Sequence, residues 1–138
     1  MKYLILMSLV VLTACSGPIT KESIRQNPAY ATTFSVKQSY QQVFDNLLKQ
    51  SRTCYLNQPT TKQLTVVGSR DNGTKTANIT LEYVYAMAEH DVILMLDMTY
   101  EADKQTLVNV YASHKGDKNK ADIIGKWLTD PAEKHSCA

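Results

Sequence analysis

Hydrophobic and polar residues alternate along four segments in the middle of the chain. These segments are 63–69, 76–87, 92–100 and 106–113. A period of two residues is typical of β-strands with one buried face. The turns between them are short and polar, so we expect neighbouring strands to pair as an antiparallel meander. The apolar face of the second and third strands is expected to hold Ala77, Ile79, Leu81, Tyr83, Tyr85 and Met87, and Val92, Leu94, Leu96, Met98 and Tyr100.

A short segment of alternating apolar and polar residues precedes the meander, and a segment with helical spacing lies between the two. Residues 32–37 predict one further strand. Ser39 and Gln42 form a capping-box pattern, and apolar residues then recur at helical spacing as far as about 52–55. This is the clearest helix of the sequence, and Cys54 falls on or near its apolar side.

A second amphipathic pattern closes the chain. Asp117 or Asn119 can cap it, and Asp130 followed by Pro131 ends it. Its apolar stripe consists of Ala121, Ile124, Trp127 and Leu128.

The order of these elements is strand, helix, four strands, helix. It predicts an α+β fold, in which an antiparallel meander sheet has its helices packed on one face. This order resembles the helix-grip-like modules of envelope lipoproteins such as BamC. The resemblance lies in the topology and involves no residue motif, so it implies a fold and transfers no site. We expect one domain over residues 32–138.

The N-terminus has the layout of a secretory signal. Lys2 precedes an apolar run, and the small residues Thr13 and Ala14 precede Cys15. The run is shorter than the roughly 20 apolar residues that cross a bilayer. We therefore expect a removed signal peptide over 1–14, and the structural alternative is a buried helix that happens to end in a cysteine.

The segment Leu12–Cys15 resembles the lipobox of bacterial lipoproteins. The resemblance covers residues 1–17 and implies cleavage before Cys15, whose sulfur and new amine then carry fatty acyl chains such as palmitate. Such chains imply a lasting membrane anchor. In this class Ser16, in place of Asp, implies the outer membrane and a domain that faces the periplasm. Residues 15–31 are polar and contain two prolines, which predicts a lipidated N-terminus followed by a flexible tether.

Charge and cysteine content refine this picture. The chain has 15 Lys and Arg against 13 Asp and Glu, and this near balance gives no long-range attraction to nucleic acid. With Cys15 assigned to lipid, Cys54 and Cys137 remain as a pair in an oxidising compartment. We expect a disulfide between them, and the alternative is a free buried Cys54 with a loose Cys137.

Candidate catalytic and metal-binding residues are sparse. His90, His114 and His135 have no further ligand at metal-binding spacing, so we expect surface residues and no metal site. Glu82 and Asp97 lie on neighbouring predicted strands and could form a carboxylate pair, but solvated charges on a polar sheet face explain them better. We expect no catalytic residues, no cofactor and no enzyme.

A possible ligand groove involves aromatic residues. Tyr83, Tyr85 and Tyr100 fall on the meander, and Trp127 lies on the last helix. Tyrosines at a sheet margin commonly form the edge of a core. They could also line a cleft between the sheet and the C-terminal helix. Several lysines near the last helix alternate with acidic residues; they are Lys115, Lys118, Lys120 and Lys126. This pattern favours an exposed face with salt bridges. The second interpretation is a surface that binds an anionic glycan or a lipid headgroup.

The sequence therefore predicts a non-catalytic lipoprotein of the outer membrane that binds or assembles another component of the cell envelope. The expected partners are the membrane, through Cys15, and an envelope protein or glycan. One alternative is a carrier of a small apolar or amphipathic ligand. Another is an inhibitor or immunity-type lipoprotein that uses loop 70–75 or 88–91 as a wedge.

Overall fold

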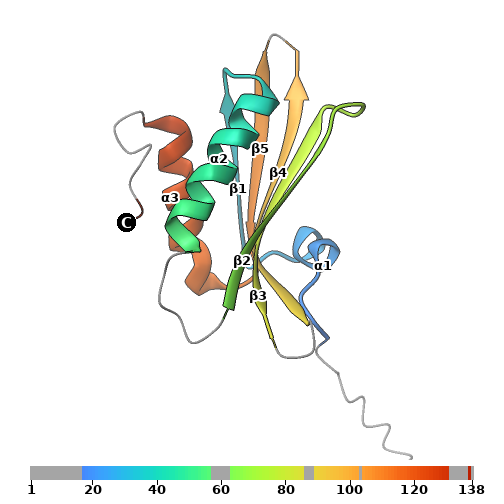
Figure 1. Cartoon of the computed structure of the whole chain (residues 1–138), viewed down its shortest axis with the longest axis vertical. Coiled ribbons are helices and arrows are strands. Elements are labelled where there is room, and N and C mark those ends of the chain that lie inside the picture. The colour runs from blue at the N-terminus through green and yellow to red at the C-terminus, as the bar shows by residue number, and fades with distance from the viewer. Residues whose placement is uncertain (1–16, 57–62, 86–88, 103, 131–136, 138) are drawn as a thin grey trace, which may run out of the picture.

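A computed structural model describes residues 17–56, 63–85, 89–102, 104–130 and 137 (Figure 1). The signal peptide, Cys15 and His135 lie outside the described residues. The elements in chain order are α1 Lys21–Gln26, β1 Tyr30–Val36, α2 Tyr40–Tyr55, β2 Gln63–Asp71, β3 Thr76–Val84, β4 His90–Glu101, β5 Gln105–Ala112, the 3₁₀ helix η1 Lys115–Asp117 and α3 Lys118–Thr129.

The five strands form a single antiparallel sheet in the order β1-β5-β4-β3-β2. The meander predicted from the alternation therefore exists as β2 to β5, and the early strand β1 joins it beside β5. This confirms the α+β class and the element order that the pattern predicts. It also makes β1 and β2 the two edges of the sheet.

Two helices cover one face of the sheet (Figure 1). α2 lies mainly over β2 and β3, and α3 lies over β1 and β5. Between them and the sheet lies the main core, where the side chains from the middle of the strands have no exposed surface at all; these are Ile79, Leu81, Leu94, Leu96, Val108 and Val110. Because α2 and α3 both pack on this face, the expectation of helices on one face holds for these two.

The opposite face carries a helix that the pattern does not predict. α1 places Ile24, which is 1 % exposed, against Val92 and Met95. Ile19 also binds the sheet, because its N–H donates to Asp91 Oδ1 at 2.8 Å and its carbonyl accepts from the N–H of Val92 at 2.9 Å. The expectation of a flexible tether over 15–31 is therefore wrong from Ile19 onward, and the folded domain begins well before residue 32.

A β-bulge changes which side chains of β4 face the main core. Leu81 pairs with Leu94, but the next residue of β3, Glu82, pairs with Val92, so Ile93 is the extra residue. Ile93 joins the main core, and Val92 packs beneath α1. From Leu94 to Met98 the side chains face the predicted sides of the sheet. Val92 and Ile93 face the opposite sides from those predicted, because the inserted residue shifts the two-residue period by one.

Of the two predicted helices, α2 begins with the expected side-chain cap and α3 does not. Ser39 caps α2, because its Oγ accepts from the N–H of Gln42 at 3.3 Å. Asp117 precedes α3, but its carboxylate accepts from Lys120 Nζ at 2.7 Å instead of capping the helix. The capping box with both reciprocal bonds lies elsewhere, between Thr20 and Ser23 of α1.

The loop that contains Asn72 and Gly73 joins β2 to β3 in a hairpin. This loop is longer than a two-residue Asn-Gly turn, and the residue in the left-handed region is Lys75, with φ 54°. Asp71 Oδ1 accepts from the N–H groups of Gly73 and Thr74 at 2.8 and 3.3 Å. These hydrogen bonds, that of Gly73 first, hold the pKa of Asp71 below its usual value.

A disulfide joins Cys54 near the end of α2 to Cys137 near the C-terminus, as the cysteine count predicts. The bond links residues that are 83 positions apart in the sequence. It ties the end of α2 to the segment that follows α3. A long closed loop restricts the unfolded chain strongly, which stabilises the folded state.

Removing this bond should therefore cost much of the stability of the domain. For Cys54→Ser combined with Cys137→Ser we expect the free energy of unfolding to fall by about 4–5 kcal/mol, as the loop-closure entropy of so long a loop suggests. Urea unfolding followed by circular dichroism measures the change. The wild-type chain in reductant should show the same loss, and an unchanged midpoint in both samples would contradict a structural role for the bond.

Candidate functional site

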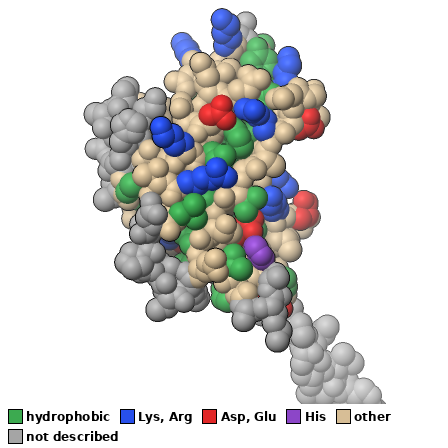
Figure 2. Space-filling view, in the orientation of Figure 1, with side chains coloured by type: hydrophobic (Ala, Val, Ile, Leu, Met, Phe, Trp, Pro, Cys, Tyr) green, Lys and Arg blue, Asp and Glu red, His purple; other side chains and the backbone are tan. Residues whose placement is uncertain are grey.

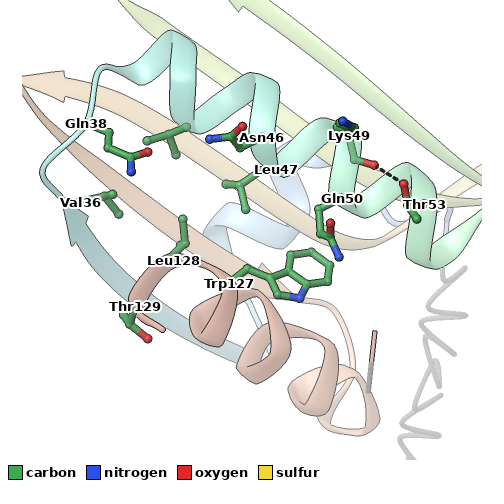
Figure 3. A pocket seen from close by; sticks show the side chains of 11 residues that line it. Val36, Gln38, Asn46, Leu47, Lys49, Gln50, Thr53, Trp127, Leu128 and Thr129 are labelled. Atoms are coloured by element: carbon green, nitrogen blue, oxygen red, sulfur yellow. Dashed lines mark hydrogen bonds between the residues drawn. The ribbon is translucent and has the colours of Figure 1, made fainter. Parts of the chain in front are cut away.

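A groove lies between α2 and α3, beside the end of β1 (Figure 3). Its volume is about 510 Å³, which is within the range of small-molecule sites. Trp127 points from α3 into the space between the two helices. The lining residues are Val36, Gln38, Val43, Asn46, Leu47, Lys49, Gln50, Thr53, Trp127, Leu128 and Thr129.

Two close contacts place the helices on different halves of the sheet. On α3, a Cβ at Gly125 would lie 2.5 Å from the ring of Phe34, so the glycine lets this helix sit directly on β1. On β2, a Cβ at Gly68 would lie 2.9 Å from Leu48 and 3.0 Å from Phe44 of α2. α3 therefore packs closely on β1, and α2 packs closely on β2. The groove is the space between these two helices.

The groove is amphipathic. Its walls contain the buried aliphatic residues Val36, Val43 and Leu47, together with the largely buried indole of Trp127. Amide and hydroxyl side chains line its mouth, and among the described residues of its lining Lys49 is the one with a charge. Such a site suits a ligand with an apolar body and a polar or anionic end.

Of the four residues of the predicted aromatic groove, Trp127 lines the groove between α2 and α3, whereas the three tyrosines lie elsewhere. Tyr83 pairs with Asp91 near one end of β4, whereas Tyr100 lies at the other end, with Lys75 Nζ 5.0 Å from its ring centroid. Tyr85 follows β3, and its N–H donates to the carbonyl of Glu89 at 2.9 Å. These residues share a predicted face, but a common face does not bring the ends of a long strand together.

Sequence reasoning missed the groove residues of α2. Asn46, Lys49, Gln50 and Thr53 recur at helical spacing beside the apolar stripe, and a polar stripe of this kind is normally solvated. Their spacing places them along one side of the helix, but nothing in the sequence shows that α3 faces that side.

Tyr55 lies beside the groove, in contact with Trp127. The two ring centroids are 6.2 Å apart at an angle of 48°. Tyr55 is 4 % exposed, and its hydroxyl has no hydrogen-bond partner in the structure as described. Burial, and to a lesser degree the charge of Asp117, raise the pKa of this phenol to about 12.

The opposite face of the sheet carries a polar row that crosses all five strands. Direct cross-strand partners make up the row in the order Ser69, Asn78, Asp97, Asn109, Thr33. Asp97 accepts from Asn78 Nδ2 at 2.7 Å and from two nitrogens of Arg25 at 2.7 and 2.9 Å. The hydrogen bond to Asp97 raises the pKa of Arg25 above its ordinary value. This row joins α1 to the sheet through a forked ion pair and borders a shallow cleft of about 470 Å³.

The two carboxylates of the sequence analysis have separate partners. Asp97 belongs to the polar row, whereas Glu82 accepts from Thr80 Oγ1 at 2.5 Å and contacts His90 Nδ1 at 2.9 Å. In a nucleophilic triad the imidazole lies between the hydroxyl and the carboxylate. Here the carboxylate lies in the middle and the hydroxyl of Thr80 is fully buried, so this arrangement does not activate a nucleophile.

Two of the four lysines around α3 form ion pairs, as their alternation with acids predicts. Lys118 Nζ donates to Asp122 at 2.6 Å, and Lys120 Nζ donates to Asp117 at 2.7 Å. Figure 2 shows that Lys and Arg side chains on the helical side are spread among other residues instead of forming one patch. Among the described residues, no three His, Cys, Asp or Glu side chains are grouped closely enough to hold a metal ion, and His114 is an exposed residue before η1.

The buried phenol of Tyr55 predicts a loss of stability in alkali. Between pH 10 and 12 the unfolded chain ionises this tyrosine while the folded chain does not, so stability should fall as the pH rises. The pKa difference corresponds to about 2–3 kcal/mol. We expect urea unfolding at pH 9 and pH 12 to show a smaller decline for Tyr55→Phe than for the wild type. Tyr111→Phe serves as a control, and equal declines in all three proteins would contradict the assignment.

Comparisons with known proteins assign the chain to no family. Among the residues that the structure covers, no helix is both long and apolar enough to cross a membrane. No protein-family model matches the chain, and no curated protein matches it significantly.

Proposed function

We propose that the chain is a lipoprotein of the bacterial outer membrane, anchored through acylated Cys15 and facing the periplasm, which acts as a non-catalytic binding module of the cell envelope. The order of Lys2, an apolar run, two small residues and Cys15 supports the anchor. The Cys54–Cys137 disulfide supports an oxidising compartment.

The single observation that carries the binding role is the amphipathic groove between α2 and α3. Its buried aliphatic walls and Trp127 accommodate an apolar body, and the amides at its mouth together with Lys49 suit an anionic head. Within the general binding role, this favours a carrier of a small amphipathic ligand. A fatty acid or a lipid with a single acyl chain has this chemistry.

The fold brings the proposed anchor close to the domain. Ile19 is already hydrogen-bonded to β4, and only three residues lie between it and Cys15, so the two are four residue steps apart. A chain of that length spans at most about 14 Å when extended. If Cys15 is in the membrane, α1 lies near the bilayer, and the domain is not held away from it by a long spacer.

The proposed anchor can be tested by the mass of the intact protein. We expect the chain extracted from bacterial membranes to begin at Cys15 and to carry the added mass of acyl chains. The Cys15→Ser variant should keep residues 1–14 and gain no lipid. An uncut, unmodified wild-type chain beginning at Met1 would refute the anchor.

The proposed binding site can be tested by fluorescence, because Trp127 is the only tryptophan of the chain. The probe is dodecanoic acid brominated at its methyl end, since bromine quenches tryptophan on contact. We expect saturable quenching below the critical micelle concentration. Lys49→Glu should weaken the affinity by about tenfold, since it replaces an attractive charge by a repulsive one.

Lys115→Glu is the matched control, because it makes the same charge change on η1, outside the lining of the groove. It should leave the titration unchanged. Absence of saturable quenching in the wild type, or equal weakening by both substitutions, would count against the groove as the ligand site.

A further inference from the structure

The edge strand β2 is open to pairing. In the structure as described, β2 has one strand neighbour, β3, and its other side has none. It is nine residues long and regular, since the bulge of the sheet lies between β3 and β4. An unpaired edge of this length presents backbone N–H and C=O groups to any strand that can match it.

This edge lacks the features by which proteins usually protect edges. Residues 63–69 contain no proline and no charged side chain, and the first charge is Arg70. The opposite edge, β1, is likewise free of charge and proline from Tyr30 to Val36, but it is two residues shorter than β2. Most of β2 therefore lacks protection against edge-to-edge pairing, and it is the longer of the two edges.

The exposed apolar residue of β2 lies at its midpoint. Val67 is 40 % exposed, and it is one of two large hydrophobic residues described as exposed, the other being Leu56 at the end of α2. An antiparallel strand with an odd number of residues that pairs with its own copy over its full length has a two-fold axis at its central residue. In the nine-residue strand Gln63–Asp71, that residue is Val67.

We propose that β2 pairs antiparallel with β2 of a second copy of this chain, with the two-fold axis at Val67, so that two five-stranded sheets form one continuous sheet. The two Val67 side chains then face each other, and Thr65 faces Ser69 of the other copy. Apolar and hydroxyl cross-strand pairs of this kind stabilise sheets.

The remaining pairs of this register are compatible as well. On one face Gln63 lies opposite Asp71, and on the other Leu64 lies opposite Arg70, so no two like charges meet directly. Leu64 and Leu48 are only partly buried at this margin of the core. A second copy beside β2 covers apolar surface that the single chain leaves in water.

The dimer leaves the groove between α2 and α3 open. α2 lies mainly over β2 and β3, α3 lies over β1 and β5, and the groove is between these helices. The β2 edge is on the other side of α2 from the groove. The proposed pairing is therefore independent of the proposed ligand site, and each can fail without the other.

Cysteine cross-linking tests the pairing and its register together. In the full-length chain with Cys15→Ser, Val67→Cys should form a disulfide-linked dimer under mild oxidation, because cross-strand partners have Cβ atoms about 5 Å apart. Thr65→Cys and Ser69→Cys should each cross-link poorly alone, because each faces the other position. A mixture of these two variants should form the cross-linked heterodimer at least about tenfold faster than either variant alone.

Gln41→Cys, on the exposed side of α2, gives the rate of random collision. Sedimentation equilibrium gives a second readout, in which the wild type should approach twice the chain mass as concentration rises and Val67→Lys should remain at one chain mass. The proposal is overturned if Val67→Cys dimerises no faster than Gln41→Cys. It is also overturned if the mixture shows no preference, or if Val67→Cys in whole envelopes cross-links only to a different protein.

Discussion

Burial of one broad sheet face is the constraint on which the rest of this structure depends. Five strands present more apolar surface than one helix can cover, so α2 and α3 each cover one half of the sheet. Gly68 and Gly125 let each helix approach its own strand closely. The groove is the space left between two well-seated helices, and it is amphipathic because it joins the margin of the core to the polar side of α2.

The face of the sheet opposite α2 and α3 is largely polar. α1 covers only a small apolar area around Met95, and the polar row beyond it extends across every strand. An antiparallel sheet can leave such a face in water, provided that its charges are paired or solvated. The forked bond between Arg25 and Asp97 meets this condition and fixes α1 to the sheet. If Cys15 carries the proposed lipid anchor, this face lies nearest to the membrane, because α1 begins only six positions after Cys15.

Much of the architecture could be predicted from local pattern, and the exceptions have clear causes. The five strands, α2, α3 and the disulfide correspond to long periodic segments or to an even pair of cysteines. α1 is only six residues long, too short to form alone, and depends on Ile24 and Arg25 meeting the sheet. The bulge at Ile93 needs only one extra residue, and the hydrophobic pattern does not reveal it because every residue from Val92 to Leu96 is apolar.

The candidate site depends partly on local sequence pattern and partly on tertiary packing. The sequence by itself determined the five strands, α2, α3 and the apolar stripe that contains Trp127, because each depends on residue type and spacing within a short segment. The even pair Cys54 and Cys137 likewise indicated the disulfide without the fold. Only the tertiary structure decided that the polar stripe of α2 faces α3, and that Tyr83 and Tyr100 lie at opposite ends of the sheet. Spacing along a chain determines which residues share a face, but the packing of one element on another determines which faces meet.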